Sequence, residues 1–100
     1  MTLSALIDEY YRVRGLTEPN EWEALGFVIT EIGEAYEHLL ERNKKFKRNN
    51  PQDKPQEWSA EAFGIELGDS IMMLYRAGKA VGVDPFELLR EKLGRKMGNV

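Results

Sequence analysis

Residues 65–81 read IELGDSIMMLYRAGKAV and form the most apolar stretch of the chain. Apolar or small side chains occupy almost every side of a helix drawn through this stretch, which is typical of a helix covered by several neighbours. Two of its charged residues, Glu66 and Asp69, share their face of the helix with small or apolar residues: Ala62, Ser70, Met73, Ala77 and Ala80. Carboxylates in such surroundings are costly unless they are paired or bind a cation.

The N-terminal half of the chain predicts two helices. Residues 3–13 carry apolar side chains at spacings of three and four, and Gly15 is a plausible stop. After a connector at residues 16–20, Asn20 and Glu23 have the spacing of a capping box. A second helix therefore starts there and continues to about Arg42.

The C-terminal half predicts two more helices. The apolar helix begins between Pro55 and Ser59, continues to about residue 81 and ends at Gly82. Asp84 is then a helix N-cap, followed by a first-turn proline, and opens a helix that reaches about Gly94. A long polar loop at residues 43–58 separates the two halves, as a lid, a binding loop or a solvated connector.

Composition restricts the class of protein. The chain has 100 residues, of which 42% are hydrophobic and 31% charged, and no stretch alternates as a strand would. The prediction is a single all-α domain over residues 1–100, a four-helix bundle completed by oligomerisation because so short a chain buries a limited core. A net charge of −3 disfavours nucleic acid as a partner. No apolar run reaches the roughly 20 residues of a membrane span or resembles a signal peptide, so we expect a cytoplasmic protein.

Two pairs of carboxylates are the candidate functional residues of the sequence. Glu31 and Glu34 lie three residues apart on the second helix, and Glu66 and Asp69 lie three apart on the third. Residues at this spacing are neighbours on a helix, so the four converge if the two helices pack antiparallel. The chain has one histidine and no cysteine, so a metal centre would use carboxylate oxygens and hold magnesium or manganese.

Other interpretations of these four acids are possible. Glu66 and Asp69 could form ion pairs with Arg76 or Lys79. Glu31 and Glu34 could face solvent, because they lie nearly opposite an apolar stripe: Trp22, Leu25, Ile29, Ile32, Tyr36 and Leu39. The acidic side also carries apolar or small residues (Ala24, Phe27, Ala35), which is typical of a helix between its own bundle and a partner subunit. His38, four residues after Glu34, is a metal ligand, a phosphate contact or neither.

The ordered motifs TEIGE at 30–34, ELGD at 66–69 and GVDP at 82–85 resemble the MazG-like all-α nucleoside triphosphate pyrophosphohydrolases. The resemblance covers roughly residues 21–96. It implies that the four acids Glu31, Glu34, Glu66 and Asp69 hold Mg²⁺, for which Mn²⁺ could substitute, and are the catalytic residues. Three departures are Thr30, where the family often has a further glutamate, a spacer of 31 residues between Glu34 and Glu66, and Lys96, where the family often has an asparagine after the lysine matched by Lys92.

The resemblance also implies a reaction and partners. A nucleoside triphosphate, ribo or deoxy, would be cleaved to the monophosphate and pyrophosphate, a house-cleaning activity on the nucleotide pool. Lys92 and Trp58 would bind the substrate, with Arg95 and Trp22 as further candidates. The enzyme would be a homodimer or homotetramer. The alternatives are a phosphoribosyl-ATP pyrophosphohydrolase-like enzyme and a non-catalytic oligomerisation or regulatory module with a relic acid cluster.

Overall fold

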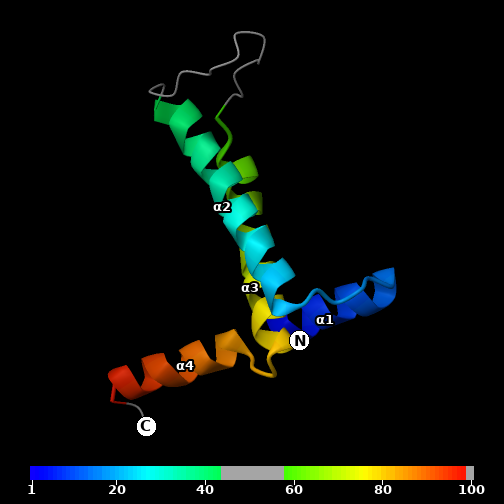
Figure 1. Cartoon of the computed structure of the whole chain (residues 1–100). Helices are drawn as coiled ribbons and strands as arrows, with labels where there is room; N and C mark the ends of the chain where they lie inside the picture. The colour runs from blue at the N-terminus through cyan, green and yellow to red at the C-terminus, as the bar shows by residue number, and fades with distance from the viewer. Residues whose placement is uncertain (44–57, 99–100) are drawn as a thin grey trace.

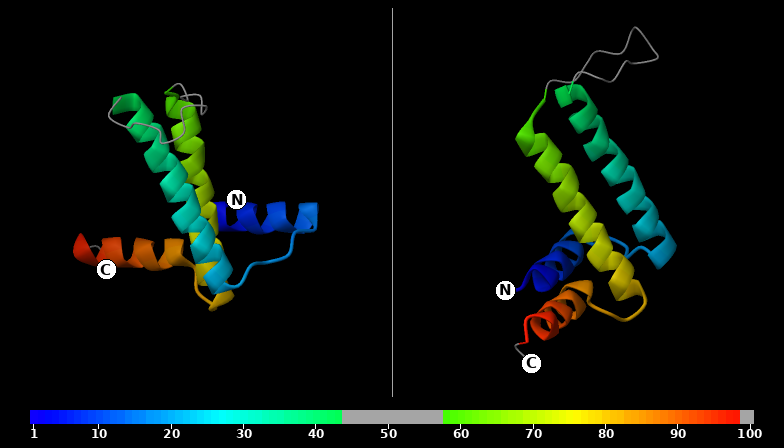
Figure 2. Two further views of the ribbon diagram at one scale, coloured as in Figure 1. Left: turned by 45° about the horizontal axis from the view of Figure 1, so that its top comes forward. Right: turned by 90° about the vertical axis from the view of Figure 1, so that its left-hand side faces the viewer.

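The computed structural model describes residues 1–43 and 58–98, and within them the chain is all-α, as predicted. Helices α2 and α3 form a long antiparallel hairpin, while α1 and α4 lie across its base and extend in opposite directions (Figures 1 and 2). The bounds are α1 Leu3–Arg14, α2 Glu21–Asn43, α3 Ala60–Ala80 and α4 Pro85–Lys96. Residues 44–57, most of the predicted polar loop, lie outside the described residues.

Local capping explains where α1 and α2 begin and end. The Thr2 hydroxyl accepts a hydrogen bond from the Ala5 amide at 3.1 Å, and α1 stops at Gly15 as predicted. The predicted capping box before α2 is present: the Glu23 amide donates to the Asn20 side chain at 2.8 Å. The Asn20 amide donates in return to the Glu23 carboxylate at 3.1 Å. These bonds satisfy amides that the first turn leaves without partners.

The turn between α3 and α4 is tightly packed. Gly82, at φ 85°, adopts the left-handed conformation that favours glycine. A Cβ on Gly78 would lie 2.6 Å from the Pro85 Cδ, so the turn lies directly against α3. Asp84 caps α4 by accepting from the Phe86 amide at 2.9 Å. Helix α4 passes the predicted stop at Gly94, which does not take a positive φ, and continues to Lys96.

The core lies at the base, where α1 crosses α3. Ile7 and Tyr11 of α1 pack with Tyr75 of α3, and Met72 and Phe86 lie against this cluster. The Phe86 ring stacks on the Tyr75 ring with their centroids 5.8 Å apart. Because Phe86 begins the first turn of α4, this one cluster fixes both short helices to the hairpin.

Helix α2 turns its small side chains toward the rest of the chain. Ala24 and Ala35 are buried, whereas the bulky stripe seen in the sequence is largely exposed, with Trp22 83% and Ile29 72% exposed. Among the described residues, 22 large apolar side chains are exposed and six hydrophobic residues are buried. A single chain is thus a hairpin with two crossing helices, and the described residues leave most of the bulky stripe exposed. No helix among the described residues is long and apolar enough to cross a membrane.

Candidate metal centre and adjoining pocket

Three of the four predicted acids meet between α2 and α3. Glu31, Glu34 and Glu66 each offer a carboxylate oxygen, and these oxygens all lie within 4.8 Å of one another. Glu31 and Glu34 are one turn apart on α2, and the antiparallel course of α3 brings Glu66 opposite them. Glu31 and Glu66 are half-buried and Glu34 is exposed. Oxygen ligands converging at this spacing suit a hard divalent cation.

The crowding of these carboxylates changes the protonation of Glu66. A hydrogen bond with Glu31, partial burial and the charges of Glu31 and Glu34 raise the pKa of Glu66 from 4.5 to about 7. Like charges held together oppose ionisation, because each carboxylate is destabilised by the next. A proton therefore relieves the repulsion near neutral pH when no cation is bound.

Asp69 lies one turn further along α3 and is exposed. It is not part of the three-carboxylate group, but it lines the same pocket as Glu31. The structure therefore places the fourth predicted ligand at the edge of the centre.

A pocket of about 460 Å³ adjoins the acids. Its walls come from α1, from the connector before α2 and from the facing sides of α2 and α3. The lining residues are Tyr11, Thr17, Glu18, Pro19, Glu23, Phe27, Glu31, Asp69, Met72 and Met73. Aromatic and thioether side chains beside carboxylates give it an apolar part and an acidic part. Tyr11 and Phe27 were not predicted as site residues. Phe27 lies one turn before Glu31 on the same face of α2, and this spacing could have identified it as a neighbour of the acids.

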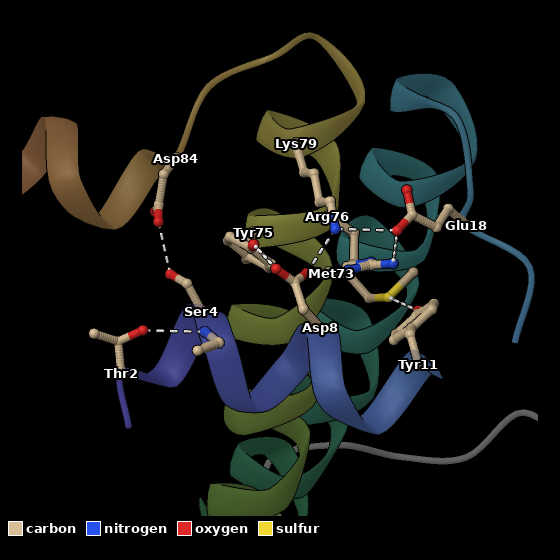
Figure 3. A network of polar contacts seen from close by, with 11 residues as sticks. Thr2, Ser4, Asp8, Tyr11, Glu18, Met73, Tyr75, Arg76, Lys79 and Asp84 are labelled. Atoms are coloured by element: carbon tan, nitrogen blue, oxygen red, sulfur yellow. Dashed lines mark hydrogen bonds and ion pairs between the residues drawn. The ribbon is translucent and has the colours of Figure 1, made fainter. Parts of the chain in front are cut away.

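An ion-pair network holds the wall of this pocket in place (Figure 3). Arg76, only 1% exposed, lies 2.9 Å from Asp8 of α1 and 2.9 Å from Glu18 of the connector. Lys79 contacts the same two carboxylates at 2.8 and 3.1 Å. Arg76 and Lys79 thus pair with Asp8 and Glu18, rather than with Glu66 and Asp69 as the ion-pair alternative supposed.

Aromatic groups complete the network. The Arg76 guanidinium lies 3.6 Å from the centroid of the Tyr11 ring, and the Tyr11 hydroxyl donates to the Met73 sulfur at 3.7 Å. The Tyr75 hydroxyl donates to Asp8 at 2.9 Å. Hydrogen bonds from Lys79 and Tyr75, with the two positive charges, lower the pKa of Asp8. Two pocket residues, Tyr11 and Glu18, are therefore fixed to α3 through Arg76.

None of the four residues predicted to contact the substrate lines this pocket. Trp58 precedes α3 at the far end of the hairpin, where it packs against Phe63 and lies under the Arg42 guanidinium. Trp22 is not among the lining residues. Lys92 and Arg95 are exposed on α4, which extends away from the hairpin (Figure 1).

His38 also lies outside the three-carboxylate group. Its side chain is half-buried, and its Nδ1 atom has no hydrogen-bond partner among the described residues.

Comparison of the chain with protein-family models, with curated proteins and with solved structures finds no match.

Proposed function

We propose that the chain is a MazG-like, magnesium-dependent nucleoside triphosphate pyrophosphohydrolase. The observation that carries the proposal is the meeting of three carboxylates from two helices beside a pocket of about 460 Å³. A triphosphate needs divalent cations at its phosphates and space for its nucleoside. This arrangement of carboxylates and pocket meets both requirements.

The donor set fits Mg²⁺. Glu31, Glu34 and Glu66 offer oxygens at a spacing suited to one site, and the raised pKa of Glu66 reflects negative charge that a cation would neutralise. Asp69, at the edge, would be the fourth ligand. When bound, Mg²⁺ would offset the charge of the phosphates and lower the pKa of a water molecule.

The chain's own groups would position and deprotonate the reactants. The apolar wall formed by Phe27, Tyr11 and the two methionines would hold the nucleoside, with the phosphates toward the acids. A water oxygen would attack the α-phosphorus. The bond between the α-phosphorus and the oxygen that bridges it to the β-phosphate would break, and pyrophosphate would leave. A carboxylate of the centre would accept the proton of the attacking water.

The proposed enzyme is a homodimer or homotetramer. Support comes from α2, whose bulky stripe is exposed in the single chain while its small side chains pack inward. Lys92 and Trp58 remain proposed substrate contacts. Because α4 extends away from the hairpin, we assign Lys92 to the assembled enzyme rather than to the site of its own chain.

The test is pyrophosphate release from a panel of ribo- and deoxyribonucleoside triphosphates with Mg²⁺ or Mn²⁺. We expect turnover that excess chelator abolishes. Glu66→Gln and Asp69→Asn should each lower turnover about 100-fold or more, since each removes a ligand with little change of shape. Glu37→Gln, an exposed acid of α2 outside the group, is the matched control and should keep normal activity.

A second measurement does not depend on turnover. Magnesium at a hundredfold excess over its dissociation constant should stabilise the folded protein by about 2.7 kcal/mol, visible as a higher melting temperature. Turnover of phosphoribosyl-ATP alone would favour the related enzyme class. Well-folded protein with neither turnover nor a magnesium-dependent shift would leave the non-catalytic module as the function.

A further inference from the structure

A second concave surface lies on the hairpin apart from the proposed site. We define the α2/α3 groove by Trp22, Leu25, Gly26 and Ile29 of α2, with Ala77 of α3 and Val81, the residue that follows α3. Its volume is about 570 Å³ and its walls are almost entirely apolar. None of these residues lines the pocket beside the acids.

The described residues leave this groove open. Gly26 lines it, and a Cβ built at Gly26 would meet nothing within 4 Å. Without a side chain at Gly26, the groove has room for a partner to approach the α2 backbone.

Helix α4 carries an apolar face that the described residues of its own chain leave exposed. Leu89, Leu93 and Met97 follow one another at four-residue intervals and continue the face begun by Phe86. Phe86 is stacked in the core, whereas the three residues beyond it are exposed. A helix of 12 residues is marginal by itself, so α4 needs a partner for this face.

The two helices that would meet carry opposite net charge. Helix α4 carries four basic side chains (Arg90, Lys92, Arg95, Lys96) and two acidic ones, Glu87 and Glu91. Helix α2 carries six glutamates and one arginine, and Glu21 lies at the rim of the groove. A basic helix meeting an acidic one is favoured in encounter and orientation.

We propose that α4 of one copy of this chain docks in the α2/α3 groove of a second copy. In a two-fold dimer both copies donate α4 and both receive it, so every contact occurs twice. The large apolar residues of groove and helix are between 48% and 83% exposed. Docking would cover seven such residues per copy, and a stable interface buries about 800 Å² on each partner.

The chain has no cysteine, so introduced cysteines report this contact without background. Leu93→Cys and Leu25→Cys proteins are mixed and treated with a short bismaleimide, and the products are separated by denaturing electrophoresis. We expect a covalent dimer that joins position 93 of one copy to position 25 of the other. The control pairs Leu93→Cys with Ile65→Cys, which lies on α3 outside the groove and is similarly exposed.

A charge substitution tests the same contact without cross-linking. Leu93→Glu should raise the dissociation constant of the dimer at least tenfold in light scattering. Leu88→Glu, on the other side of α4 and equally exposed, should change it far less. A monomeric parent protein would overturn both the docking and the proposed assembly. A dimer that cross-links equally well through Ile65 would overturn the docking alone, and pyrophosphate release tests the enzyme independently.

Discussion

Glu66 and Arg76 lie ten residues apart on α3 and meet opposite electrostatic conditions. Glu66 faces two like charges, and its pKa is raised to about 7. Arg76 is buried against two opposite charges, Asp8 and Glu18. The unusual position of Glu66 was evident from the helical wheel. The partners of Arg76 were not, because no local pattern tells which helix will cross α3 at that point.

The raised pKa of Glu66 predicts how stability depends on pH without metal. Between about pH 4.5 and 7 the folded state keeps a proton on Glu66 that the unfolded state releases, so the free energy of unfolding falls as pH rises. The melting temperature with chelator should therefore decrease from pH 5 to pH 8. Glu66→Gln should remove most of that decrease.

The pH range distinguishes the contribution of Glu66 from that of the acids in the ion-pair network. Asp8 and Glu18 have lowered pKa values, so their contribution is lost only at more acidic pH. Circular dichroism melts of parent and Glu66→Gln protein at four pH values make the comparison. A parent melting temperature that stays level or rises over this range would contradict the crowding of Glu31, Glu34 and Glu66.

The burial of Arg76 predicts that removing its volume costs more stability than removing its charge. Arg76→Ala leaves a void beneath Tyr11 and should destabilise the fold by about 2–4 kcal/mol, in the range of large-to-alanine changes in cores. Arg76→Met keeps most of the volume, and Lys79 still pairs with Asp8 and Glu18, so about 1 kcal/mol is expected. Urea unfolding measures both. Equal losses in the two variants would show that the charge, rather than the packing, matters most.

At the scale of elements, helix ends are predictable and helix faces are less so. The Asn20–Glu23 box and the Asp84 cap depend on residues within one turn, and both are present as predicted. The face of α2 that packs inward depends on what lies outside the chain as well. Its bulky stripe reads as core, yet α2 packs through Ala24 and Ala35, which let two helices approach closely.

The turn between α3 and α4 predicts a glycine that alanine cannot replace. A Cβ at Gly78 would lie 2.6 Å from Pro85 and 3.1 Å from the Val83 carbonyl oxygen. Gly78→Ala should therefore destabilise the protein by about 1–3 kcal/mol, despite the higher helix propensity of alanine. Gly64→Ala is the matched control, since nothing lies within 4 Å there, and it should be neutral or stabilising. Both are compared by thermal unfolding.

At the scale of the whole molecule, the described residues include more exposed than buried large apolar side chains. Six hydrophobic residues are buried among the described residues, a small core for a chain of 100. Its length and stripes point to association, but they do not say which surfaces meet. That choice depends on the shapes of grooves and projecting helices, which arise only after the hairpin has formed.

This exposure predicts that stability depends on protein concentration. If folding is completed by association, mass action raises the melting temperature as concentration increases. Differential scanning calorimetry over a hundredfold concentration range should show a steady rise, with light scattering giving a mass above 11.5 kDa. A constant melting temperature together with the monomer mass would contradict the proposed homo-oligomer.

The position of the acids within the hairpin has an evolutionary consequence. Glu31 and Glu66 lie between the two helices, where apolar side chains would hold the pair together more strongly than crowded carboxylates do. Random substitution at these two positions would therefore tend to produce a more stable protein, and selection for folding alone would keep the change. If the proposed function holds, a lineage that no longer needed it would lose these glutamates early. Selection for cation binding, rather than for folding, would then be what keeps both glutamates in place.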